Sequence, residues 1–419
     1  MNVTYTVWGA VALGITAALV LLARSGSRDG LGYLILYVAF FGLGPAVNHV
    51  LGSEIYGGIV PDKIPQATLG VALAIAGMFV VGLVLPARRA AADRARLTDS
   101  SPPPLLTLAF WVLAGYAVAL LALRGPAMLS GDKLLRIDVA GPWHYPYLLL
   151  QIFACSTYFM AVTSRSGRIA YWANFACYTA YCLATNERDF IYVAFALLLH
   201  RQLFRTRGVT LRVGVTGALC LLGAAYLTSV RSGQQLGVQQ ALNEGSVLTV
   251  DTTVMSLVPF VVPHTHGATF WHSVTALVPG LDGVPPALAD WFVGHVAAGS
   301  GSGYGFTLTG EAYLNFGMVG IPILFGLLAA AARLLMNRVD RGHFTAYLSM
   351  LFVVSLMYNI RGESRALLAT LVYGLIFYGL LQLVRSRWGG TRRAQPTPAT
   401  RVTPVAGQPA PPVTAGSRR

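Results

Sequence analysis

Charged residues are scarce in this sequence. Asp, Glu, Lys and Arg make up 11% of its 419 residues, against about 25% in a usual soluble domain. In contrast, 55% of the residues are hydrophobic, and the mean hydropathy is +0.60. A soluble protein is therefore excluded. The apolar residues are numerous enough for roughly ten membrane crossings, because each helical crossing needs about 20 residues.

Cysteines are few, and several short catalytic motifs are absent. No two cysteines have Cys-x-x-Cys spacing, so neither a zinc site nor a redox pair is indicated. All four lie inside apolar stretches: Cys155, Cys177, Cys182 and Cys220. The sequence also lacks Asp-x-Asp, the motif that holds a divalent ion against a nucleotide-sugar diphosphate, as well as a phosphate-binding Gly-x-x-x-x-Gly-Lys loop and a serine-centred hydrolase elbow. Metal-dependent transfer from a nucleotide sugar is therefore disfavoured.

Long apolar runs, each ended by charge, Pro or Gly, predict an all-α polytopic membrane protein with about 11 transmembrane helices. The first run lacks a basic n-region and a small-residue cleavage site, so we interpret it as a retained helix rather than a signal peptide. The expected helices cover residues 3–23, 31–47, 67–85, 104–123, 142–162, 169–184, 190–204, 209–229, 311–335, 344–359 and 365–384.

The distribution of basic residues predicts the orientation of these helices. If the N-terminus is outside, 22 of the 30 Lys and Arg residues fall on the inner side and eight on the outer side. Such a bias is what the positive-inside rule requires. We therefore expect an outer N-terminus and an inner C-terminus. The net charge of +14 follows from this topology, without nucleic acid as a partner.

The expected helices divide the chain into four segments. Residues 1–229 hold the first eight helices, 230–310 form one large outer loop, and 311–384 hold the last three helices. The basic remainder, 385–419, is rich in Pro, Thr and Ala, and we expect a disordered cytoplasmic arm. Apolar stretches within the loop are cut by prolines and are too short to span, so we expect re-entrant or interfacial helices there.

The spacing of charged residues predicts a polar site on the outer side. Arginines at helix ends reach for the membrane interface, so the number of residues between them measures depth at about 1.5 Å per residue. By this measure, four hairpin ends lie at the same depth on the outer side of the membrane. They carry Arg188, Arg231, Glu311, and Arg361 with Arg365.

Arg361 and Arg365 lie one helical turn apart, so they can present two guanidinium groups to one ligand. Arginine forks match phosphate oxygens in bidentate geometry. The arginines of the predicted site therefore favour an anionic ligand. The alternative for any single arginine is an interface anchor or an ion pair with Glu187, Asp189 or Glu363.

Residues before the ninth expected helix suggest further functional groups. A glycine-rich run, 299–305, allows backbone amides to approach an anion, although a flexible linker fits equally well. Thr309 is the expected N-cap, which places Glu311 in the first helical turn, where the helix dipole favours its charge. Glu311 is alternatively a base that takes a proton from a substrate hydroxyl.

Three histidines in the outer loop raise the question of a metal. His264, His266 and His272 do not have the spacing of a common ligand template, so we expect no metal site. His264 or His266 as a general base remains an alternative to Glu311.

The sequence resembles the Wzy-type O-antigen polymerases, also called oligosaccharide repeat unit polymerases. The similarity lies in Gly310-Glu311-Ala312-Tyr313-Leu314-Asn315-Phe316-Gly317-Met318-Val319-Gly320, in Thr228-Ser229-Val230-Arg231, and in Arg361-Gly362. The helix count and the single large outer loop also resemble that family. The resemblance extends over about residues 186–365, whereas the first five helices share only the hydropathy.

The resemblance implies an inverting glycosyltransferase of GT-C-like fold in the bacterial inner membrane, with its active site facing the periplasm. It would move a growing glycan from undecaprenyl diphosphate onto the terminal sugar of an incoming lipid-linked repeat unit. The implied partners are this lipid-linked oligosaccharide and the bilayer, with room for a chain-length regulator and a flippase. Arginines that neutralise the diphosphate leaving group would replace both a metal and a general acid, so no cofactor is expected.

The expected site residues follow from combining this chemistry with the predicted outer site. Arg188, Arg231, Arg361 and Arg365 are expected to hold diphosphate. Glu311 is expected to act as the base, with His264 or His266 as the alternative, and Tyr304 and Tyr313 are expected to contact sugar rings.

Three other functions remain open at the level of sequence. An O-antigen ligase would use the same donor with a lipid A core acceptor. A transporter or flippase for a lipid-linked substrate is disfavoured, because no internal repeat is found and the charges gather at one face rather than at the midplane. A non-catalytic assembly scaffold would tolerate single arginine substitutions.

Overall fold

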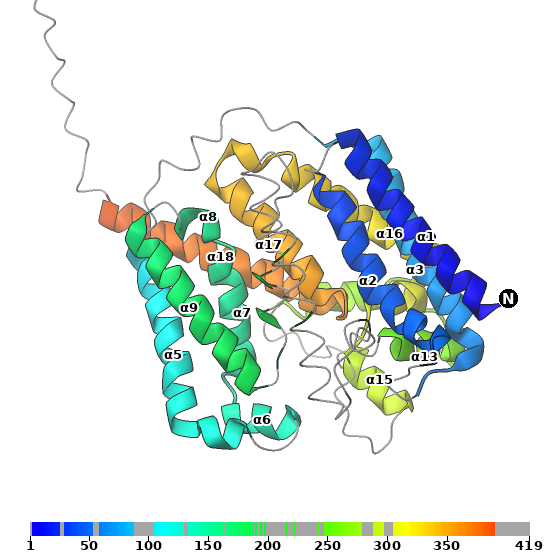
Figure 1. Cartoon of the computed structure of the whole chain (residues 1–419), viewed down its shortest axis with the longest axis horizontal. Helices are drawn as coiled ribbons and strands as arrows, with labels where there is room; N and C mark the ends of the chain where they lie inside the picture. Colours follow the sequence, from blue (N-terminus) through cyan, green and yellow to red (C-terminus); the bar gives the residue numbers. More distant parts are fainter. Residues whose placement is uncertain are drawn as a thin grey trace, which may run out of the picture.

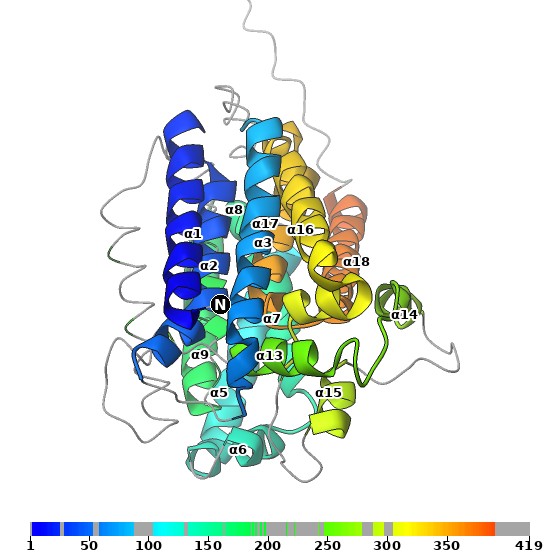
Figure 2. The same cartoon turned by 90° about the vertical axis from the view of Figure 1, so that its right-hand side faces the viewer.

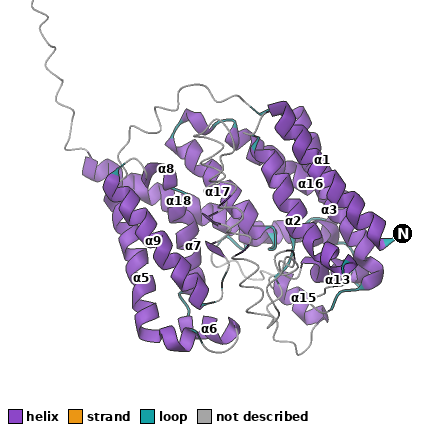
Figure 3. Cartoon of the chain, in the orientation of Figure 1, coloured by secondary structure: helices purple, strands orange, loops and turns teal. Residues whose placement is uncertain are grey.

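The structure, a computed structural model, describes residues 2–25, 29–52, 58–87, 104–129, 133–161, 164–185, 187, 189–190, 193–194, 197, 215, 222, 242, 247–278, 288–296 and 305–389. The regular elements among these residues are helices, and none of the described residues forms a strand (Figure 3). The all-α prediction is therefore confirmed for this part of the chain.

The described helices form two groups that are joined by the last two helices (Figure 1). The first group holds α1 (Val3–Ser25), α2 (Gly30–Val50), α3 (Ile64–Val84, preceded by η1, Pro61–Lys63), α13 (Val247–Leu257) and α16 (Leu308–Met336). The second holds α5 (Pro104–Met128), α6 (Lys133–Ala140), α7 (His144–Cys155), α8 (Tyr158–Ala161) and α9 (Arg165–Ala184). The joining helices are α17 (His343–Asn359, after η2, Val339–Arg341) and α18 (Ser364–Gly389). Two short helices complete the set, α14 (Ala268–Thr275) and α15 (Leu288–Val296).

Among the described residues, six segments are long and apolar enough to cross a membrane: Val3–Ser25, Gly30–Val50, Pro61–Val84, Pro104–Met128, Leu308–Arg341 and Ser364–Arg385. The chain is thus an integral membrane protein with several spans. In Figure 2 the long helices α1, α3 and α16 run side by side, whereas α13, α14 and α15 gather toward one end of this bundle. These short loop helices have the lengths expected for interfacial or re-entrant pieces.

The five other predicted spans are not among these six segments. The helix expected at 142–162 is interrupted between α7 and α8, because the Ser156 and Thr157 hydroxyls donate to the carbonyls of Ile152 and Ala154. Such side-chain bonds compete with the helical backbone pattern. The 169–184 helix is α9, which is rich in tyrosine, and the 344–359 helix is α17, which has 17 residues. Most of 190–204 and 209–229 lies outside the described residues.

Close packing against α3 holds α16 in place. A Cβ atom on Gly77 of α3 would lie 2.3 Å from the carbonyl oxygen of Pro322 in α16, so any side chain at this position would force the helices apart. Small residues allow this kind of backbone approach between membrane helices, where packing replaces the hydrophobic effect as the driving force. The position of α16 is therefore set by the N-terminal helices.

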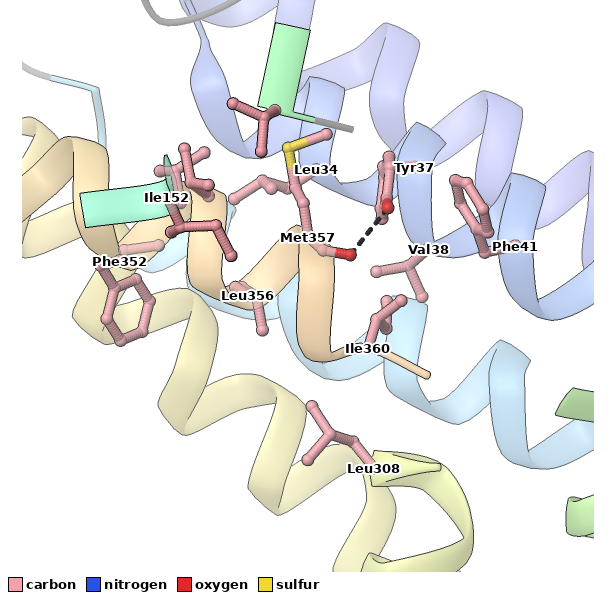
Figure 4. Close-up of a cluster of buried hydrophobic side chains, with 14 of the residues drawn as sticks. Leu34, Tyr37, Val38, Phe41, Ile152, Leu308, Phe352, Leu356, Met357 and Ile360 are labelled. Carbon is pink, nitrogen blue, oxygen red and sulfur yellow. Dashed lines mark hydrogen bonds between the residues drawn. The ribbon is translucent and has the colours of Figure 1, made fainter. Parts of the chain in front are cut away.

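A buried cluster fixes the end of α17 in the same way. Leu34, Tyr37 and Val38 of α2 lie against the last two turns of α17 (Figure 4). The Tyr37 hydroxyl donates to the carbonyl oxygen of Met357 at 2.7 Å. The residues just after Met357 lead into the turn between α17 and α18, so α2 also determines where that turn lies.

An ion pair at the opposite end of α16 is completely buried. A guanidinium nitrogen of Arg333 lies 2.8 Å from Asp29 Oδ1, and the two side chains are 1% and 0% exposed. Asp29 also accepts the backbone N–H groups of Leu31 and Gly32, which caps α2. Their contact shows that the start of α2 and the end of α16 lie on the same side of the helix bundle.

Removing one partner of this pair is expected to cost much more stability than removing both. Arg333→Met should lower the free energy of unfolding by about 3–5 kcal/mol, because it leaves the Asp29 carboxylate buried without a counterion. The measurement is unfolding in mixed detergent and SDS micelles. Asp29→Asn combined with Arg333→Met should recover most of the loss, and Arg341→Met, at an exposed arginine of the same end, serves as the control. Equal stability of Arg333→Met and Arg341→Met would contradict the role of the pair.

Candidate functional site

The start of α16 is organised by threonine side chains and a buried acid. The helix begins after Thr307, whose hydroxyl accepts the N–H of Gly310 at 2.9 Å. The expectation of Thr309 as N-cap is thus wrong by two residues, since Thr309 instead donates to Asp251 Oδ2 at 2.8 Å. Thr307 also donates to the other oxygen of Asp251. Glu311 still lies in the first turn of the helix.

The sequence analysis did not identify Asp251 as a candidate residue of this site. It lies in α13, outside the six candidate spans, and is 1% exposed. Burial raises the pKa of its carboxyl to about 6, although the hydrogen bonds from Thr307, Thr309 and Gly310 act in the opposite direction. The available signal was a lone carboxylate in an apolar stretch, since buried acids require partners. Asp251 anchors α13 to the start of α16.

Glu311 joins α16 to two other helices. Its Oε1 atom accepts hydrogen bonds from the hydroxyls of Thr269 in α14, at 2.9 Å, and Ser364 in α18, at 2.7 Å. Its Oε2 atom accepts the backbone N–H of Ser364 at 2.6 Å. The side chain is 0% exposed. A carboxylate with three short donors is held in one position, and this position fixes the start of α18.

The second hairpin end predicted for the site is the turn between α17 and α18. We call residues 360–365, this turn and the first two residues of α18, the arginine turn. It contains Arg361 and Arg365, and both side chains are half-buried. Because Ser364 bonds to Glu311, the turn and the start of α16 meet, as the residue counts predicted. Within the described part of the chain, the guanidinium of Arg365 has no ion-pair or hydrogen-bond partner. The arrangement thus places the turn that carries Arg361 and Arg365 against a buried, fixed carboxylate.

The arginine turn and the end of α17 before it also contact two other segments. The Tyr358 hydroxyl, three residues before Arg361, donates to Asp189 Oδ2 at 3.3 Å. Glu363 of the turn accepts the N–H of Leu288, the first residue of α15, at 2.6 Å. The three other predicted site residues, Arg188, Arg231 and Tyr304, lie outside the described residues.

The helix α16 is broken after its second turn. Phe316 and Gly317 have non-helical backbone angles, and Gly317 has φ +63° and ψ −154°, which favours glycine. The carbonyls freed at Leu314 and Asn315 accept the N–H groups of Thr265 and His266 at 3.1 Å each. Asn315 also accepts from Thr265 and Gly267 through its side-chain oxygen. The break therefore holds the 264–267 segment against α16.

The two histidines of this segment differ in environment. His264 is half-buried, and its Nδ1 lies 3.3 Å from the carbonyl oxygen of Leu314, which can only accept a hydrogen bond. Nδ1 must then carry the proton in the neutral ring, and Nε2 is left as the basic atom. His266 is exposed and has φ +48°. His264 is thus the histidine with a defined tautomer.

Tyr313, which was expected to contact a sugar ring, is buried. The Tyr313 hydroxyl accepts from Gln66 of α3 at 3.0 Å, and the side chain is 5% exposed. Its described contacts are those of a packing residue. In the described ranges, no three His, Cys, Asp or Glu side chains lie close enough together to hold a metal ion. This holds also for His264, His266 and His272.

The break in α16 is testable through Gly317. Gly317→Ala should cost about 1–3 kcal/mol of stability, because an alanine in this backbone conformation is strained. Thermal unfolding in detergent would measure it. Gly379→Ala, at a helical position with open space around it, should be neutral or slightly stabilising. An equally small effect at both glycines would show that the break is not required.

Of the comparisons with known proteins, the one with family models gave a match. No curated protein and no solved structure matches the chain. Residues 288–390 match the family model described as O-antigen polysaccharide polymerase Wzy. The match begins later and extends further than the resemblance noted in the sequence, and it includes α15, the start of α16 and the arginine turn. The resemblance to the Wzy-type O-antigen polymerases is thereby confirmed over the part of the chain that holds Glu311, Arg361 and Arg365.

Proposed function

We propose that this protein polymerises O-antigen or exopolysaccharide repeat units on the periplasmic face of the bacterial inner membrane. It transfers the growing glycan from undecaprenyl diphosphate to the terminal sugar of an incoming lipid-linked repeat unit. The match to a polymerase family supports a glycosyltransferase-type enzyme in general. The observation that carries the specific proposal is the Glu311–Ser364 contact, which joins the matched start of α16 to the arginine turn.

The donor site proposed here uses the arginine turn. Arg365 and Arg361 bind the diphosphate, because guanidinium groups match phosphate oxygens and remain charged at any physiological pH. As the bond between the sugar C1 and the diphosphate oxygen breaks, its electron pair stays on the diphosphate. The arginines stabilise this charge without a metal. Arg188 and Arg231 remain expected members of this site.

We assign the proton acceptor to His264 rather than Glu311. The acceptor hydroxyl attacks C1 from the face opposite the diphosphate, forms the new glycosidic bond with inversion, and loses its proton. His264 Nε2 is the basic atom of an oriented ring, whereas both oxygens of Glu311 already accept hydrogen bonds. Glu311 then acts as a positioning residue for the arginine turn.

The orientation proposed for the membrane is an outer N-terminus and an inner C-terminus. It places the start of α16 outside, and it places Arg333 inside with the exposed Arg341. The outer end holds Glu311, the arginine turn and the short helices α13 to α15, in agreement with the asymmetric distribution of basic residues.

Arginine substitution tests the donor site. In cells that lack this protein, the surface polysaccharide should stop at a single repeat, and wild-type protein should restore a ladder on a gel. Arg365→Ala at a matched membrane level should reduce the amount of polymer by about 100-fold, because one electrostatic donor to the leaving group is lost. Arg341→Ala, at the other end of the molecule, should restore the full ladder.

The gel pattern also separates the alternative functions. Loss of all capped product in the absence of the protein would indicate a ligase or a flippase. A full ladder with Arg361→Ala and with Arg365→Ala would overturn the donor site.

Histidine substitution tests the proton acceptor. His264→Ala should reduce the rate of polymer formation by about 100-fold or more, the usual contribution of a general base, while His266→Ala should stay within a few-fold of wild type. Initial rates with purified protein and lipid-linked repeat units would measure both. Equal effects of the two substitutions would argue against the assignment to His264.

A further inference from the structure

The short helix α14 turns its polar side inward, toward α16 and α18. Thr269 donates to Glu311 Oε1 at 2.9 Å and accepts a side-chain N–H of Asn315 at 2.6 Å. Ser273, which is buried, shares a hydrogen bond of 2.8 Å with the Ser364 hydroxyl. These bonds fix the rotation of α14 about its own axis, so they also determine which of its side chains point away from the protein.

The side chains that point away are apolar. Trp271 is 66% exposed and Val274 is 46% exposed, and Val278, in the turns that continue after α14, is 52% exposed. Their spacing places them on one helical face, which we call the α14 face. The helix contains no Asp, Glu, Lys or Arg. A surface helix in water turns its apolar side to the core, so this reversed arrangement indicates apolar surroundings.

The helix α14 lies at the end of the lipid-exposed side of α16. Beyond its break, α16 exposes apolar side chains at helical spacing, namely Val319, Ile323 and Leu327. Because α16 belongs to a candidate membrane span, we expect this row to contact lipid. Phe316, at the break itself, is also exposed and stacks on Phe270 of α14, with the ring centroids 6.4 Å apart.

The length of α16 places the break, and with it α14, near a membrane boundary. From Arg333 back to Phe316 the helix rises about 25 Å at 1.5 Å per residue. The hydrocarbon core is about 30 Å thick, so the break lies close to the boundary opposite Arg333. In Figure 2, α14 lies outside the column of long helices, beside the start of α16, whereas α15 lies farther from them. Tryptophan is enriched at such boundaries, in agreement with the exposed Trp271.

These observations favour lipid over a protein as the occupant of the α14 face. Lipid already surrounds the adjacent row of α16, so it reaches the α14 face without any further component. A protein partner would have to displace that lipid. A short helix with a polar side and an apolar side is suited to lie along the membrane interface, with the apolar side among the first carbons of the acyl chains.

We propose that the α14 face inserts among the acyl chains of the bilayer at this boundary, and that the bilayer thereby holds the hydroxyl side of α14 against Glu311 and Ser364. Lipid is then part of the support of the arginine turn, because Ser364 belongs to that turn. The inference does not depend on the proposed function, since it concerns what α14 contacts and not what the site transfers.

Photo-cross-linking tests this contact directly. Trp271 is replaced by benzoylphenylalanine, whose excited ketone adds across a neighbouring C–H bond. The full chain is placed in nanodiscs of palmitoyl-oleoyl phosphatidylglycerol, illuminated and analysed by mass spectrometry. We expect an adduct with the mass of the phospholipid. Val319, replaced in the same way, is the positive control in the exposed row of α16, and His295, exposed on α15, should give no lipid adduct.

A charge placed on the α14 face tests whether the face is inserted. Val274→Asp, combined with the cross-linker at position 271, should reduce the lipid adduct at least severalfold, because a carboxylate in hydrocarbon is costly. His295→Asp should leave this adduct unchanged. The adduct at position 319 should persist in the Val274→Asp protein, which would show that the long helices are still inserted.

A lipid adduct at position 319 without one at position 271 would overturn the proposal. A cross-linked dimer from position 271 in place of the lipid adduct would also overturn it, and would assign the α14 face to a second copy of the chain. An undiminished adduct with Val274→Asp would contradict insertion. None of these results depends on the polymer ladder, so the proposed function and this contact can fail separately.

Discussion

The bond between the Glu311 carboxylate and Ser364 is the interaction on which the rest of the site depends. It is buried, it uses both carboxylate oxygens, and it joins helices that are separated by a full hairpin in the sequence. It holds the start of α18, and the arginines beside it, next to the first turn of α16. A charge buried at this point is stable only because Thr269 and Ser364 satisfy it, so the electrostatic requirement of Glu311 also determines where α14 lies.

The same principle operates at both ends of α16. At one end Glu311 and Asp251 accept hydrogen bonds from hydroxyls and backbone N–H groups, and at the other Arg333 forms an ion pair with Asp29. The middle of the helix carries no charged residue. A helix with buried charge at each end and an apolar middle has one favourable depth in a bilayer, because shifting it would move one of the charged ends toward hydrocarbon.

Hydropathy was sufficient to predict the long helices, because apolar runs as long as those of α1, α3 and α18 are typical of membrane-spanning helices. It could not predict the interruption between α7 and α8, which depends on two hydroxyls that bond to the backbone. Residue counts between arginines brought Glu311 and the arginine turn together correctly. They could not reveal Asp251 or the exact contacts of Glu311, because these depend on how short loop helices fold back onto α16.

The bond between Tyr37 and Met357 joins the N-terminal helices to the segment that matches the polymerase family. The segment that matches the polymerase family begins only at residue 288, yet its α17 is fixed by α2 and its α16 is packed on α3. The recognisable segment is therefore not a module that could be exchanged between related chains on its own. The N-terminal helices, which resemble the family only in hydropathy, act as its scaffold, and a chimaera would have to keep the two halves of each packing contact together.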